Sequence, residues 1–85
     1  MGMMVIVYKV YADLEKLDSI VASLNTVKSA EPREVRREPV GFGIEVIKVA
    51  YVLPDKVEGL VEKLEAEVRA IDGINEVEVE AMTLL

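Results

Sequence analysis

The sequence predicts an α+β fold in which two helices cover one face of a four-stranded antiparallel sheet. Two long apolar runs are typical of central strands, two segments repeat apolar residues at helical spacing, and two charged segments are typical of edge strands. The 85 residues, of which 52% are hydrophobic, suffice for one core and are too few for two domains. We therefore expect one domain over residues 1–85.

The first strand and helix are predicted by a change of hydrophobic period. Residues Met4 to Tyr11 are nearly all apolar, with only Lys9 charged, which is typical of a strand buried on both faces. Asp13 is expected to cap a helix. Its apolar positions are Leu14, Leu17, Ile20, Val21, Leu24 and Val27. The helix is expected to end between Asn25 and Pro32, because proline cannot continue it.

A β-hairpin is predicted next. Arg33 to Glu38 is highly charged and predicts a short edge strand stopped by Pro39. Ile44 to Leu53 is a second long apolar run, and the turn between the two strands contains Gly41-Phe42-Gly43. The two glycines permit positive φ, so the turn is tight. Phe42 either faces a partner or folds back onto its own sheet.

The second helix and the last strand complete the element order βαββαβ. Asp55 with Glu58 three residues later predicts a capped helix start, and an apolar stripe at helical spacing ends before Gly73. Residues 76–81 alternate glutamate with valine or alanine, so we expect the valines to face the helices and the glutamates to face away. This strand is expected at the second edge of the sheet.

With right-handed crossovers, this order predicts a ferredoxin-like sandwich with strand order 4-1-3-2 and both helices on one face. The two apolar strands are expected at the centre as a parallel pair. The hairpin turn, the N-terminus and the C-terminal residues are then expected to meet at one end. Phe42, Met82, Leu84 and Leu85 would form an apolar surface there, of the kind that marks protein contacts.

The amino-acid composition excludes several kinds of functional site. The chain has no cysteine and no histidine, so thiolate and imidazole sites are absent. Its net charge of −6 opposes the phosphate attraction on which nucleic-acid binding depends, and no apolar run is long enough to cross a membrane. The glutamates of residues 76–80 are spaced roughly 7 Å apart along one strand, too far to converge on one ion. We expect no metal and no cofactor.

One stretch resembles a known family. EPVGFGIEVIKVAYVLPD at residues 38–55, then VEGLVEKLEAEV, an acidic strand and a short tail, resemble the guanine-nucleotide exchange domain of the elongation factor 1-beta family in its short archaeal form. The resemblance implies a cytoplasmic translation factor that promotes GDP/GTP exchange on the GTPase elongation factor 1-alpha by docking near its nucleotide and Mg²⁺ site. Such a factor makes and breaks no bond and is not an enzyme.

The resemblance also implies site residues. In the family the turn aromatic and the extreme C-terminus approach the nucleotide site. These map onto Gly41, Phe42 and Gly43, and onto Met82, Thr83, Leu84 and Leu85. The family's basic residue near the C-terminus falls on Leu84, and no lysine or arginine follows Arg69. A steric wedge at the two segments, or a charge from Arg37 before the turn, would replace it.

Three readings stay open. The chain is either an active exchange factor or a weakened relative that binds the GTPase without efficient exchange. A small regulatory module that dimerises or holds a ligand is a third reading, although the connection Tyr11-Ala12-Asp13 leaves little room for a ligand loop. The sequence predicts no oligomeric state.

Overall fold

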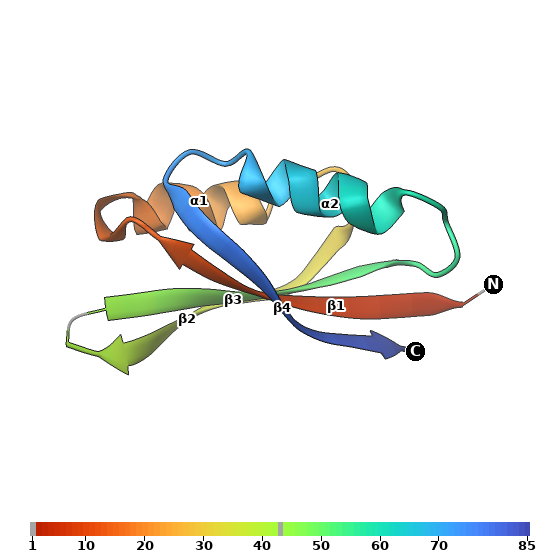
Figure 1. The fold of residues 1–85 in the computed structure, drawn as a ribbon, viewed down its shortest axis with the longest axis horizontal. Coiled ribbons are helices and arrows are strands. Elements are labelled where there is room, and N and C mark those ends of the chain that lie inside the picture. Colours follow the sequence, from red (N-terminus) through yellow and green to blue (C-terminus); the bar gives the residue numbers. More distant parts are fainter. Residues whose placement is uncertain (1, 43) are drawn as a thin grey trace.

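The computed structural model describes residues 2–42 and 44–85, except for the side chain of Ile44. Its elements follow the predicted order (Figure 1). They are β1 (Met3–Ala12), a 3₁₀ turn (Leu14–Lys16), α1 (Leu17–Leu24), β2 (Glu31–Gly41), β3 (Ile44–Pro54), α2 (Leu60–Arg69) and β4 (Ile74–Leu84). The predicted α+β fold is confirmed.

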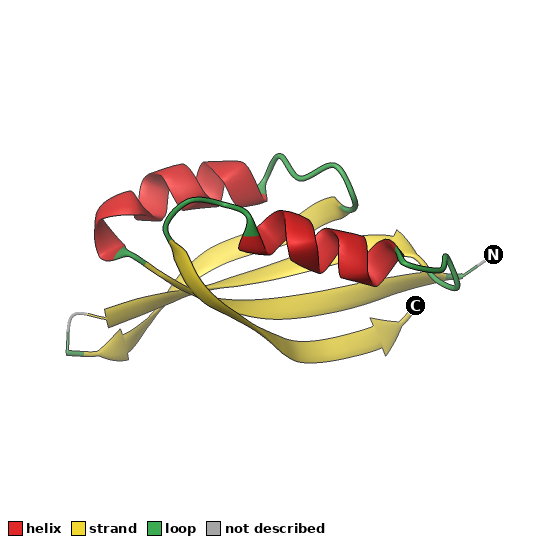
Figure 2. Cartoon of the chain, turned by 45° about the horizontal axis from the view of Figure 1, so that its top comes forward, coloured by secondary structure: helices red, strands yellow, loops and turns green. Residues whose placement is uncertain are grey.

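The sheet has the order β2-β3-β1-β4, which is the predicted 4-1-3-2 order read from the other edge. Figure 2 shows both helices on the same face. All three strand pairs are antiparallel, so the expectation of a parallel central pair was wrong. The helical crossover keeps β1 parallel to β2 and the hairpin reverses β3, so β3 must run against β1.

The direction of β3 separates two segments that were expected to meet. Tyr11 pairs with Val46, so β3 begins beside the end of β1, whereas Leu84 pairs with Met4 at the start of β1. The hairpin turn and the two chain ends therefore lie at opposite ends of a molecule 43 Å long (Figure 1). The predicted cluster of Phe42 with the N-terminus and the C-terminal residues was wrong.

The core lies between the helices and one face of the sheet. It takes alternate residues from β1 and β3, as period-two strands require. Ile6, Leu64 and other large apolar side chains are fully buried there, and burial of one such side chain contributes about 1.5–3 kcal/mol. Tyr8 and Tyr51 lie side by side in this layer, with ring centroids 6.3 Å apart and an edge-to-face angle of 62°.

The helices are shorter than predicted. Asp13 does cap the first helical segment, since its side chain accepts a hydrogen bond from the Glu15 N–H, but residues 14–16 form a 3₁₀ turn. The second helix starts at Leu60, after Gly59 in the left-handed region, so the predicted cap at Asp55 was wrong. The Asp55 N–H instead donates to the Gly2 carbonyl, which extends the pairing of β1 with β3.

The edge strands are longer than predicted. β2 continues through Pro39, which lies opposite Glu45 at the sheet edge, so the proline does not stop the strand. In β4, Val77 is buried as expected. Val79 pairs with Tyr8 on the helical side but is half exposed, because it lies on the outermost strand. A register shift follows at the position opposite Val7 and Tyr8.

Glu67 on α2 holds the loop between α1 and β2. Its carboxylate accepts hydrogen bonds from the Lys28 N–H at 2.8 Å, the Ser29 N–H at 3.0 Å and the Ser29 hydroxyl at 2.6 Å. The Ser29 hydroxyl, with smaller contributions from the two N–H groups, lowers the pKa of Glu67 below its ordinary value of 4.5. The three bonds fix the chain as it leaves the first helix.

Glu67→Gln is expected to lower the free energy of unfolding by about 1 kcal/mol at pH 7, because a neutral amide accepts more weakly and only through one oxygen. A lowered folded-state pKa stabilises the protein above the unfolded pKa, and this contribution is lost as the pH falls through the folded pKa. The difference between the two proteins should therefore shrink in acid. Urea unfolding between pH 3 and pH 7 measures it, with exposed Glu62→Gln on the same helix as the control. A difference that does not change with pH would contradict a stabilising role for the ionised Glu67 carboxylate.

Candidate functional site

The hairpin turn extends past the rest of the sheet. Gly41 pairs with Ile44 two rungs beyond the last rung that β1 reaches, where Tyr11 pairs with Val46. A register shift between Pro39 and Gly41 lies next to the turn. Such bulges are common where a strand must redirect a side chain near a functional site. The tip therefore projects from the sheet without a neighbouring strand.

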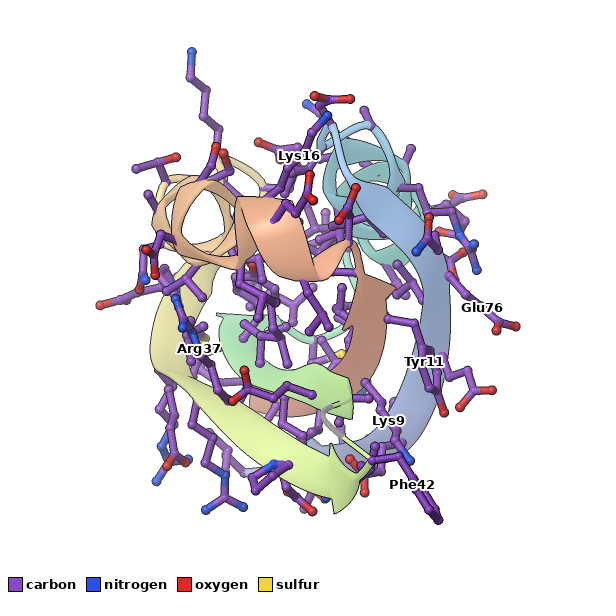
Figure 3. The ribbon with its side chains drawn as sticks, turned by 90° about the vertical axis from the view of Figure 1, so that its left-hand side faces the viewer. Lys9, Tyr11, Lys16, Arg37, Phe42 and Glu76 are labelled. Carbon is purple, nitrogen blue, oxygen red and sulfur yellow. The ribbon has the colours of Figure 1, made fainter. Side chains whose placement is uncertain are left out.

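Phe42 is fully exposed at this tip, with a relative exposure of 103%. Figure 3 shows its ring extending away from the ribbon. Its φ is +56°, the left-handed region that bulky residues rarely adopt, and Gly41 before it has φ +107°. Of the two readings left open by the sequence, the structure has the exposed one. Gly43, the third residue predicted for this site, lies outside the described residues.

Arg37 lies on β2, opposite Ile47, and is not part of the tip. Its guanidinium forms an ion pair and a hydrogen bond with Asp18 of α1. Figure 3 shows it on the helical side of β2, well away from Phe42. The structure therefore assigns Arg37 a contact between sheet and helix, and it does not bring the arginine together with the turn aromatic.

The C-terminal residues form an exposed apolar edge at the other end. Met82, Thr83 and Leu84 pair with Ile6, Val5 and Met4 of β1, and the Leu85 N–H donates to the Met3 carbonyl at 2.9 Å. Leu84 and Leu85 are about two-thirds exposed, at 67% and 66%. We call Met3, Val79, Met82, Leu84 and Leu85 the C-terminal edge. Because its backbone is paired, this edge is a preformed surface.

The other face of the sheet carries the glutamate row. The Lys48 ammonium lies 3.0 Å from a Glu80 carboxylate oxygen and 3.2 Å from one of Glu38. Hydrogen bonds to these carboxylates, Glu80 first, raise the pKa of Lys48. The Tyr11 hydroxyl donates to Glu78 at 3.3 Å, and the Lys9 ammonium lies 5.5 Å from the centre of the Tyr11 ring. The glutamates thus face away from the helices, as predicted.

Other kinds of site find little support in the described residues. Only Asp13 separates β1 from the first helical turn, and its N–H donates to the Gly73 carbonyl, so no ligand loop is formed there. Within residues 2–42 and 44–85, no three acidic side chains lie close enough together to hold a metal ion. No helix in this part of the chain has the length and apolar composition needed to cross a bilayer.

The sequence did not reveal one feature of this glutamate-bearing face of the sheet, which is called the open face below because neither helix covers it. A hollow of about 310 Å³ lies above Val7, Ala50 and Ala81, between the two edge strands. The only sequence signal is the two alanines, each placed between larger residues of its strand. Both alanines pair with Val7, one from each side, and their small side chains leave this space.

Fold and exposed residues together define a small ferredoxin-like domain with an exposed apolar surface at each end. Its backbone matches that of the C-terminal domain of the MgtC protein from Mycobacterium tuberculosis with a TM-score of 0.59, 13% sequence identity, and coverage of 99% of this chain and 88% of the other. At this identity the match shows the fold alone.

Sequence comparison gives the family. Residues 1–85 match the model of the EF-1 guanine nucleotide exchange domain, and the chain belongs to this family. It is similar to the elongation factor 1-beta of Methanospirillum hungatei, with 40% identity over all of both chains. The elongation factor 1-beta of Ignicoccus hospitalis is 34% identical over 91% of this chain and 86% of its own length. The resemblance seen in the sequence is confirmed.

Proposed function

We propose that this chain is a single exchange domain that promotes GDP/GTP exchange on elongation factor 1-alpha in the cytoplasm. The observation that carries the proposal is the match of residues 1–85 to the EF-1 exchange domain. The fold supports it, because the described residues offer two exposed apolar surfaces that a partner could contact.

Exchange requires only that the factor bind the nucleotide-free GTPase more tightly than the nucleotide-bound form. By linkage, its binding then weakens nucleotide binding by the same factor. The proposed contacts are the turn with Phe42 and the C-terminal edge, one of them near the nucleotide and Mg²⁺ site. Because these surfaces lie at opposite ends of the long axis, they would touch separate regions of the GTPase.

Release of a fluorescent guanine nucleotide from elongation factor 1-alpha, followed by rapid mixing, tests the proposal. The wild-type chain is expected to accelerate release, and Phe42→Ala to slow it several-fold, because truncation of an exposed aromatic anchor weakens docking. Leu14→Ala is the control, since Leu14 is 47% exposed in the helical layer outside both surfaces. An unchanged rate for Phe42→Ala would remove the turn from the site, and no acceleration by the wild-type chain would contradict exchange activity.

A second candidate is a weakened relative that docks without efficient exchange. The observation that favours it is the absence of any lysine or arginine after Arg69. In that case the wild-type chain binds elongation factor 1-alpha with little acceleration of release, and Leu84→Lys raises the rate. Arg37→Ala tests whether Arg37 supplies the positive charge in place of the missing basic residue near the C-terminus. If Arg37 only ties β2 to α1 through Asp18, the variant loses stability without a change in exchange rate.

A further inference from the structure

One face of the sheet carries no covering element among the described residues. The helices occupy the other face, and nothing lies below the sheet in Figure 1. The residues that point to this open face pair across the strands. They include Val5, Val7, Ala50, Val52, Ala81 and Thr83 toward the chain ends. The open face is therefore partly apolar, although no layer of the domain packs on it.

The open face contains the 310 Å³ hollow. All four strands line it. Val7, Ala50 and Ala81 provide apolar lining, and Glu34, Arg36, Lys48 and Glu80 add charged groups. A hollow of this size and lining fits an apolar side chain of a partner, with polar contacts around it.

The open face as a whole is mostly acidic, whereas the four charged residues that line the hollow are two acids and two bases. The open face carries Lys9, Arg36 and Lys48, against Glu31, Glu34, Glu38, Glu76, Glu78 and Glu80. Lys48 is already engaged by Glu38 and Glu80. The complementary surface is apolar with lysine or arginine around it. A second copy of this chain would bring two acidic faces together and is disfavoured.

The open face also runs between the two proposed contact surfaces. The turn belongs to β2 and β3, and the C-terminal edge lies at the start of β1 and along β4, so the same sheet joins them. The open face reaches this edge at Met3, whereas Val79, Met82 and Leu84 pair with core residues and lie on the helical side. A partner that reaches both ends on the helical side would have to pass over α1 and α2, whereas the open face offers a continuous sheet (Figure 2).

We propose that the open face is a third contact with the same GTPase, whose apolar side chain enters the hollow over Ala50 and Ala81 while its basic residues face the glutamates. This inference rests on the proposed function and adds the surface that bridges the two ends.

Ala50→Arg tests it, because the arginine would fill the hollow and add a positive charge. The control is Ala22→Arg, the same substitution at an exposed position on α1. Isothermal titration with nucleotide-free elongation factor 1-alpha is expected to give a Kd about tenfold or more weaker for Ala50→Arg, and an unchanged Kd for Ala22→Arg. Ala81→Arg, which enters the hollow from β4, should repeat the loss. Thermal unfolding verifies that each variant is folded.

The outcomes separate the two proposals. If the wild-type chain binds and both hollow variants bind equally well while folded, the open face is not a contact and the proposed function stands. If the wild-type chain does not bind the GTPase, the proposed function fails and its third contact with it. If the wild-type chain forms a dimer that Ala50→Arg abolishes, a second copy occupies the face and the inference is overturned.

Discussion

Gly73→Ala is expected to lower the free energy of unfolding by about 3 kcal/mol, from backbone strain and crowding together. Gly73 has φ +95° in the turn between α2 and β4. A Cβ there would lie 2.9 Å from the Lys16 Cδ and 3.0 Å from the Ile20 Cδ1. Ile20 is fully buried, so its side chain has little room to move away from the new methyl group, whereas the half-exposed Lys16 side chain can shift although its ammonium lies 2.8 Å from Asp72.

Gly59→Ala separates strain from crowding. Gly59 also has positive φ, at +79°, but no atom lies within 4 Å of the position its Cβ would take. This variant is expected to lose only the conformational part, about 1 kcal/mol. Urea unfolding followed by circular dichroism measures both. Equal losses would show that the turn relaxes around the new methyl group and that the close packing of Gly73 against the first helical segment contributes nothing.

The central strands and the edges could be predicted because their composition depends on where they lie in the sheet. Residues 4–11 and 44–53 are apolar since strands in the middle are covered by neighbours, and residues 33–38 are charged since an edge strand meets water. Element order then fixed which strands pair. These arguments use average burial, so they do not depend on single contacts.

The direction of β3 was predicted wrongly because the connection geometry was misapplied, and not because the sequence lacked the information. A helical crossover followed by a hairpin reverses the third strand relative to the first, and the element order already required this. The error moved Phe42 to the wrong end of the molecule. The ends of helices and strands were predicted wrongly for a different reason. A capping residue such as Asp55 has alternative partners, and the N–H of Asp55 donates to the Gly2 carbonyl instead.

The candidate site was predictable in part. The exposed turn aromatic follows from the glycine beside it, because a residue in a protruding turn has no neighbouring strand to pack on. The hollow over Ala50 depends on which residues face each other across three strands, and the register shift near Glu80 sets that. Register of this kind depends on single bulges, which leave no period in the sequence.

The two core tyrosines are expected to respond in opposite ways to loss of the hydroxyl group. The Tyr51 hydroxyl donates to the Leu24 carbonyl at 2.6 Å at the end of α1, so Tyr51→Phe leaves a buried acceptor without this donor and should cost about 2 kcal/mol. The Tyr8 hydroxyl is buried and has no hydrogen-bond partner among the described residues. Burial, with a smaller contribution from Glu65, raises the pKa of Tyr8 to about 12, so the group stays neutral and unpaired.

Tyr8→Phe removes a polar atom whose burial nothing offsets, and should therefore leave the stability unchanged or raise it by up to about 1 kcal/mol. The two substitutions delete the same atom from adjacent rings, so the packing loss is matched and the difference isolates the hydrogen bond at the C-terminus of α1. Urea unfolding at pH 7, followed by circular dichroism, measures both. If Tyr8→Phe destabilised the protein as much as Tyr51→Phe, the Tyr8 hydroxyl would have a partner in solution, and Arg69 or Glu65 of α2 would be the first to test, since both act on its pKa.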